Sequence, residues 1–270
     1  MVGAITVVDA HVHVHPGANI DALLDAAAEN LGNAAREQGA SQWQCVLMLA
    51  EMKQRRWFDS IVDVVGSASG RWSYELLPGD DISVRARCGE RDLTIVAGRQ
   101  VVTSEGLEVL TLGTREVIPD RLPLTQTLDA ANAGRSLAVL PWGAGKWLGA
   151  RGKLVDATIA GVSATRVFPG DNGGRPGFWP DPAVFKVAAD KNCAVVSGTD
   201  PLPLPGEEAR VGTFGFWMPG TLPSAAPGRT LLERLRTEPS TSVHSFGKLQ
   251  GTVQFIRNQT ALRLHKAPVQ

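Results

Sequence analysis

Cysteine is scarce in this sequence of 270 residues, which contains only Cys45, Cys88 and Cys193. The three residues are far apart, and none belongs to a Cys-x-x-Cys pair. An odd number of isolated cysteines argues against a disulfide framework and against a zinc knuckle. We interpret them as buried free thiols in a reducing cytoplasm.

Excess charge of one sign and long apolar runs are also missing. The 27 Lys and Arg residues balance the 27 Asp and Glu residues, so bulk charge does not support a nucleic-acid or anionic-membrane partner. No run reaches the roughly 18 apolar residues of a membrane helix. The apolar start has no basic region and breaks at Asp9, unlike a signal peptide. We therefore expect a cytoplasmic protein with no nucleic-acid and no membrane partner, and the sequence leaves the oligomeric state open.

Histidine is rare as well, yet three of the five histidines fall within five positions. His11, His13 and His15 follow the apolar run 5–8, which predicts a buried strand. Side chains at i and i+2 of a strand point to the same side, so His11 and His13 share a face. Because neutral imidazole is the commonest metal-binding side chain, the cluster predicts a metal or catalytic site. The alternative is a strand end that is merely rich in histidine.

Apolar periodicity predicts an α/β chain whose middle part consists of antiparallel hairpins. The first part is expected to contain a helix over about 20–38, a strand over Cys45–Leu49 and a helix over Lys53–Val65. Short apolar runs between turn residues then predict antiparallel hairpins over Trp72–Leu77, Ile82–Arg87, Leu93–Ala97, Gln100–Thr103 and Leu107–Leu112.

The α/β rhythm resumes after these hairpins. Helices are expected over Leu124–Ala133, Leu154–Ile159, 181–191 and Arg229–Arg236, with strands over Leu137–Leu140, Ala164–Phe168, Cys193–Ser197 and Gly251–Ile256. The Pro- and Gly-rich stretch 201–227 is expected to form a long ordered loop. A single α/β barrel domain over residues 1–270, closed or nearly closed, is the simplest assembly.

Polar residues gather at the carboxyl ends of the expected strands, where sites form in barrels of parallel strands. The candidates are Asp9, His11, His13, His15, Glu51, Gln100, Glu105, Glu108, Trp142, Asp171, Asp200, Glu207 and Glu208. Histidine, glutamate and aspartate that converge from several strand ends are typical of a hydrolytic metal site. Asp200 follows its strand directly, so we favour a functional role over a turn cap. For Glu51 and Glu108, a role in the site and a solvated position remain equal alternatives.

The glycine-rich segment 143–152 contains Lys146 and Arg151, two cations that suit an anionic substrate. It is not a phosphate-binding P-loop, because the Gly-Lys-Ser/Thr spacing is absent. A purely structural glycine loop is the alternative.

Several of these motifs resemble those of the PHP family, the polymerase and histidinol phosphatase type of metal-dependent phosphoesterase. Asp9-Ala10-His11-Val12-His13 looks like the family's first His-x-His motif, and Ser197-Gly198-Thr199-Asp200-Pro201 looks like its Gly-Ser-Asp-Ala-His segment. Other family positions differ here. Gln100 stands in place of a bridging Glu, Glu108 in place of a His, Trp142 in place of another His, and Pro201-Leu202 in place of Ala-His.

The resemblance implies a distorted (β/α)7 TIM-like barrel, here with the embedded antiparallel hairpin region. It implies one to two divalent ions, Zn, Mn or Fe, held by His11, His13 and Asp200 with help from Glu108. The implied activity is hydrolysis of a small, possibly phosphorylated substrate by water that the metal activates. His15 and Glu51 would be catalytic, and Lys146 and Arg151 would bind the substrate.

Two alternatives remain open at this point. The substituted positions favour a catalytically degenerate PHP-like barrel that binds a ligand or a protein. An amidohydrolase-type enzyme also begins with His-x-His and ends with a late-strand Asp, but its carbamylated Lys and mid-barrel histidines are not evident in this sequence.

Overall fold

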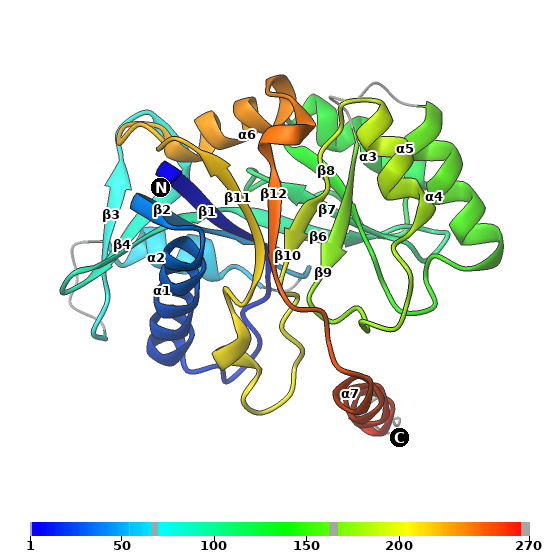
Figure 1. Cartoon of the computed structure of the whole chain (residues 1–270), viewed down its shortest axis with the longest axis horizontal. Coiled ribbons are helices and arrows are strands. Elements are labelled where there is room, and N and C mark those ends of the chain that lie inside the picture. Colours follow the sequence, from blue (N-terminus) through cyan, green and yellow to red (C-terminus); the bar gives the residue numbers. More distant parts are fainter. Residues whose placement is uncertain (1, 54, 66–69, 162–166, 266–270) are drawn as a thin grey trace.

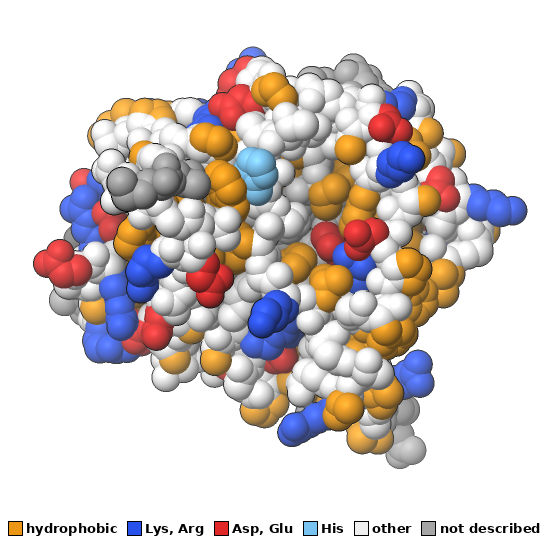
Figure 2. Space-filling view, in the orientation of Figure 1, with side chains coloured by type: hydrophobic (Ala, Val, Ile, Leu, Met, Phe, Trp, Pro, Cys, Tyr) orange, Lys and Arg blue, Asp and Glu red, His pale blue; other side chains and the backbone are white. Residues whose placement is uncertain are grey.

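The fold is built on two mixed β-sheets with helices packed around them (Figure 1). It is seen in a computed structural model that describes residues 2–53, 55–65, 70–161 and 167–265. Within these residues, no helix is long and apolar enough to cross a membrane. On the face in Figure 2, Lys and Arg side chains are interspersed with Asp and Glu, in line with the balanced charge of the sequence.

The first sheet has seven strands in the order β12-β11-β1-β2-β5-β4-β3. The strands are β1 (Val2–Val12), β2 (Ala40–Leu49), β3 (Ser73–Leu77), β4 (Asp80–Cys88), β5 (Arg91–Val96), β11 (Phe214–Pro219) and β12 (His244–Gly247). β1, β2 and β5 are parallel, whereas β5, β4 and β3 form antiparallel hairpins. On the other side of β1, β11 and β12 are antiparallel additions.

The second sheet has five strands in the order β10-β9-β8-β7-β6. The strands are β6 (Gly98–Val102), β7 (Glu108–Leu112), β8 (Leu137–Pro141), β9 (Phe168–Asn172) and β10 (Val196–Gly198). β6, β7 and β8 are antiparallel, and β8, β9 and β10 are parallel.

The expected TIM-like barrel is therefore wrong. Neither sheet closes on itself within the described residues, and antiparallel pairs are frequent in both. The main reason is β11, which lies inside the stretch expected to be a loop and occupies the edge of β1. The two sheets meet near the carboxyl end of β1, where the Asp200 N–H donates to the His11 carbonyl at 2.8 Å.

The helices cover both sheets. They are α1 (Ile20–Glu37), α2 (Trp57–Asp63), α3 (Leu124–Ala133), α4 (Gly149–Gly161), α5 (Ala183–Asp190), α6 (Pro227–Thr237) and α7 (Thr252–His265). There are also two short 3₁₀ helices, η1 (Glu207–Arg210) and η2 (Ser240–Ser242). The side chain of Asn19 caps α1 by accepting the Ala22 N–H at 3.1 Å.

Several expected element boundaries need correction. The strand expected at Gly251–Ile256 is wrong, because those residues lead into α7, which projects from the body in Figure 1. The helix expected at Leu154–Ile159 is longer and forms α4. Most of the strand expected at Ala164–Phe168 lies outside the described residues, and β9 begins at Phe168.

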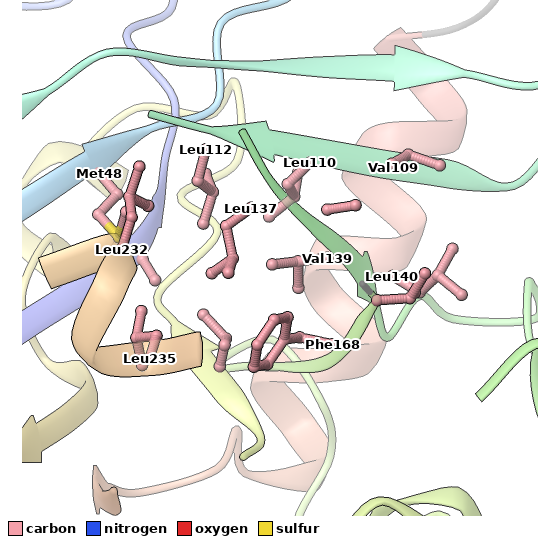
Figure 3. Close-up of a cluster of buried hydrophobic side chains, with 14 of the residues drawn as sticks. Met48, Val109, Leu110, Leu112, Leu137, Val139, Leu140, Phe168, Leu232 and Leu235 are labelled. Carbon is pink, nitrogen blue, oxygen red and sulfur yellow. The ribbon is translucent and has the colours of Figure 1, made fainter. Parts of the chain in front are cut away.

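The core has two parts, because β1 is buried on both faces. Val8 and Ala10 belong to one apolar cluster, whereas Ile5 and Val7 belong to the other. Figure 3 shows the first cluster, in which Leu232 of α6 lies among side chains of β2, β7, β8 and β9. Alternate side chains of a strand point to opposite faces, so the apolar run of β1 packs into both clusters. This packing fixes the position of the residues that follow it.

Candidate metal centre

His11, His13 and Asp200 form a compact group of three potential metal ligands at the carboxyl end of β1. The His11 and His13 Nε2 atoms are 3.1 Å apart. Asp200 Oδ1 lies 3.5 Å from His11 Nε2 and 3.4 Å from His13 Nε2. Both histidines are buried, and the Asp200 side chain keeps 24% of its surface exposed. The two amino-terminal histidines and the late carboxylate therefore lie close together, and their binding of a shared cation stays a prediction.

These separations suit one shared cation. A tetrahedral site with bonds of about 2.0–2.1 Å places neighbouring ligand atoms about 3.3 Å apart. The three measured separations, 3.1, 3.4 and 3.5 Å, lie on either side of that value. Two imidazole nitrogens and one carboxylate oxygen also form a donor set that zinc, manganese and iron accept.

The buried carboxylate of Asp9 fixes the backbone around this group. It accepts hydrogen bonds from the N–H and hydroxyl of Thr199, at 2.8 and 2.5 Å, and from the Gly212 N–H at 2.8 Å. The His11 N–H is a fourth donor, at 3.2 Å. Burial raises the pKa of Asp9 to about 6, although these hydrogen bonds oppose the rise. Asp9 therefore joins β1 to the segment that carries Asp200.

Asp200 has an uncommon backbone conformation, with φ at 53°, a left-handed region that aspartate tolerates better than most residues. Two residues earlier, Gly198 lies so close to β1 that a Cβ atom there would stand 2.2 Å from the backbone nitrogen of His11. The absence of a side chain at Gly198 lets the Asp200 carboxylate approach both histidines.

Two amides support the centre, and the sequence predicts neither of them as a metal ligand or a catalytic residue. Gln100 Oε1 lies 3.3 Å from His11 Nε2, on the strand β6. Asn172, at the end of β9, donates to Asp200 Oδ2 at 2.9 Å and to the Trp142 carbonyl at 2.7 Å. Gln100 occupies the position of the bridging Glu in the PHP resemblance, and this position is the signal that the sequence offers for it. Asn172 lies in the segment Asp171-Asn172-Gly173-Gly174-Arg175, which in the sequence is primarily a turn signal.

The electrostatics of the group favour its ligand form. Burial alone would raise the pKa of Asp200, but nearby His11 and His13 outweigh it and hold that pKa below its usual range. Burial lowers the pKa of His11. A neutral imidazole beside an ionised carboxylate is the state in which these groups bind metals.

The other two proposed catalytic residues lie beside the centre rather than in it. His15 Nε2 donates to the Pro201 carbonyl at 2.8 Å, and its ring centroid is 5.4 Å from that of His13. The Glu51 carboxylate is buried, accepts the Phe58 N–H at 3.0 Å at the start of α2, and lies 3.9 Å from the Arg99 guanidinium. Burial raises the pKa of Glu51. Their catalytic roles stay predictions.

Glu108 and the proposed substrate-binding cations lie on β7 and the glycine-rich segment. Glu108 forms an ion pair with Lys146 and is not one of the three converging ligands. Lys146 is nonetheless close enough to Asp200 to help lower the pKa of that carboxyl. Arg151 lies in α4 and donates to the Gly145 carbonyl at 2.9 Å, which joins the helix to the residues before it.

Comparison with known proteins gives a fold but no family. No protein-family model and no curated protein matches the sequence. The chain is similar to a solved structure, the crystal structure of PsfC from Pseudomonas syringae PB-5123. The likeness covers 97% of this chain and 98% of PsfC, with a TM-score of 0.53 and 13% identical residues. It concerns the fold alone, and the resemblance to PHP proteins stays a prediction.

Proposed function

We propose that this protein is a metal-dependent hydrolase whose centre is formed by His11, His13 and Asp200. The observation that supports it is the set of ligand separations between 3.1 and 3.5 Å, which fit one tetrahedral cation. Three protein ligands leave a fourth position for water or substrate, the arrangement of catalytic rather than structural zinc sites.

A divalent metal in this position supplies Lewis-acid polarisation of the scissile group and lowers the pKa of bound water. Gln100, 3.3 Å from His11 Nε2, offers an amide that can orient water or a substrate oxygen. Asn172 holds the Asp200 carboxylate through Oδ2, so that Oδ1 faces the two histidines. Each of these residues fixes an atom before substrate arrives, which is how a preorganised site lowers the barrier.

A phosphate ester is the proposed substrate class. Lys146 provides a cation close to Asp200, and among the described residues it forms an ion pair with the partly buried Glu108. An incoming phosphoryl group can compete with Glu108 for this cation, because phosphate offers several strong acceptor oxygens. The Glu108–Lys146 pair would then open when substrate binds.

Metal analysis combined with an activity panel tests the proposal. Untagged protein is analysed for Zn, Mn and Fe, then assayed on phosphomonoesters, phosphodiesters and lactones with each metal added. We expect stoichiometric metal and phosphoester hydrolysis, both lost in the His11→Ala/His13→Ala double variant. His244→Ala is the matched control, because His244 is exposed and stacks on Trp217 away from the centre.

Other outcomes would favour the alternatives. Bound metal with hydrolysis of lactones or amides alone would favour amidohydrolase-type chemistry. Protein that binds no metal and hydrolyses nothing would favour a degenerate binding module.

A further inference from the structure

A pocket of about 540 Å³ adjoins the metal centre on the side of His13. Its lining comes from the loop after β1 with Leu23 of α1, and from the segment after β10 with Glu208 of η1. The lining residues are His13, His15, Pro16, Gly17, Ala18, Leu23, Pro201, Leu202, Pro203, Leu204, Pro205 and Glu208. His13 therefore belongs to the centre through Nε2 and also lines the pocket. A volume of this size is typical of pockets that bind small molecules.

The walls of the pocket are apolar and preformed. Pro16, Pro201, Pro203 and Pro205 have fixed φ angles and no backbone N–H, so they offer few donors to a polar ligand. The His15–Pro201 hydrogen bond joins the two loops across the pocket. A rigid apolar wall binds an apolar group with little loss of conformational entropy.

The loop after β10 is also fixed from behind. The buried Glu207 carboxylate accepts the Leu202 N–H at 3.1 Å and pairs with Arg210 at 2.7 Å. Glu207 therefore holds the loop through Oε2, whereas its neighbour Glu208 lines the pocket.

The charge of the lining is one-sided. No Lys or Arg lines the pocket, and Glu208 is its only carboxylate. The Glu208 side chain has no ion pair or hydrogen bond with any other described residue. An anionic group is thus disfavoured in the pocket, whereas a cation beside Glu208 gains a charge-assisted hydrogen bond.

We infer that this pocket binds an apolar group that carries an amine, and that this group is the alcohol part of the substrate. The second half of the inference rests on the proposed hydrolase function. The phosphoryl end of the ester would lie at the metal centre near Lys146, and the apolar amine-bearing end would occupy the pocket beyond His13. Esters of sugars or of acidic alcohols fit this lining poorly, because the walls are apolar and the only charge is negative.

Binding and hydrolysis are measured separately with one pair of probes. Tyramine and 3-(4-hydroxyphenyl)propionate share a phenol ring and differ in the sign of the side-chain charge. Binding of each to the full-length protein is followed by calorimetry, with and without added metal. We expect tyramine to bind at least about tenfold more tightly, the effect of one charged hydrogen bond.

Three variants assign the binding to this pocket. Glu208→Gln should remove most of the preference for tyramine, and Ala18→Leu should weaken both probes by filling the pocket. Glu233→Gln, on the exposed side of α6 outside the pocket, should change neither. Equal binding of both probes, or binding that none of the pocket variants alters, would overturn the inference.

The phosphate esters of the same two phenols test the substrate part. With metal present, tyramine phosphate should show a KM at least about tenfold lower, and Glu208→Gln should remove that difference. Hydrolysis of both esters with equal KM would overturn the substrate assignment while the hydrolase function stands. Hydrolysis of neither ester, with tyramine still bound in the pocket, would overturn the substrate assignment and leave the ligand pocket, and the wider activity panel then decides the hydrolase function.

Discussion

Asp200 and His11 are joined twice, although 188 residues separate them along the chain. The Asp200 backbone N–H donates to the His11 carbonyl at 2.8 Å, and Asp200 Oδ1 lies 3.5 Å from His11 Nε2. The backbone hydrogen bond fixes the position of the carboxylate independently of its charge. Side-chain substitutions at Asp200 can therefore test ligation without displacing the loop.

Asp200→Asn should lower metal affinity by more than about 100-fold, because even outer partners of metal ligands contribute about 10–100-fold. The variant keeps the size of the side chain and the backbone hydrogen bond, so its thermal midpoint without metal should stay close to that of the parent. Competition with a chromogenic chelator measures the affinity. Unchanged affinity would show that Asp200 is not a ligand.

Asn172→Ala should weaken metal binding by about 10–100-fold, because the Asp200 carboxylate loses the donor that orients it. Some stability should also be lost, about 1–3 kcal/mol, since the buried Trp142 carbonyl loses a donor as well. Chelator competition and urea unfolding give the two quantities. Asn33→Ala, at an exposed position of α1, is the control. If the two variants bind metal equally well, Asn172 plays no positioning role.

Gly198→Ala should destabilise the protein by about 1–3 kcal/mol, because its Cβ would stand 2.2 Å from the backbone nitrogen of His11. The metal centre should be disturbed at the same time, since β10 must move away from β1. Gly3→Ala is a matched control in β1, where a Cβ meets nothing within 4 Å. Urea unfolding of both variants provides the comparison, and equal stability would contradict the close approach.

Tyr74 should titrate well above pH 10. It is the only tyrosine of the chain, so absorbance at about 295 nm reports on this residue alone. Burial, and next the charge of Asp21, raise its pKa to about 12. Because the pKa of Tyr74 is higher in the folded than in the unfolded protein, its protonated hydroxyl contributes fully to the free energy of unfolding below pH 10. This contribution is lost as the pH rises towards 12. A native midpoint near 10, with the far-UV circular dichroism retained, would contradict this environment.

Elements with a local signal were predictable from the sequence. The apolar stripe of α1 and its Asn19 cap lie within one short segment, and the helix occurs at Ile20–Glu37 as expected. The hairpin strands β3 to β5 alternate with clear turn residues and fall close to the expected ranges. Each of these patterns is set by neighbours a few residues away.

Elements stabilised by distant partners were not predictable in this way. β11 lies in a Pro- and Gly-rich stretch and becomes a strand because Phe216 and Met218 pair with β1. Its position at the edge of β1 is what separates the real fold from the expected barrel. The apolar residues 253, 255 and 256 looked like a strand, but they belong to α7, where Ile256 is exposed and Phe255 contacts Phe178.

The residues of the candidate site can also be divided into those with a local sequence signal and those whose role depends on distant partners. His11 is the penultimate residue of β1 and His13 is the first residue after it, so their closeness follows from neighbouring positions, and Asp200 follows from its position after β10. Asn172 and Asp9 act across strands, on partners 28 and 190 residues away, respectively. No local pattern carries that information, so their roles emerge only once the two sheets are in place.

The carboxylate of Asp9 also restricts movement of the loop that lines the pocket. It binds Thr199 at the start and Gly212 at the end of the loop that carries the proline-rich wall. Both ends of this loop are thus tethered to one buried atom group on β1, and the loop cannot swing as a hinged lid. Movement of this wall is therefore limited to the proline-rich stretch between the two hydrogen-bonded ends. A ligand reaches the pocket past a wall whose ends stay fixed to β1.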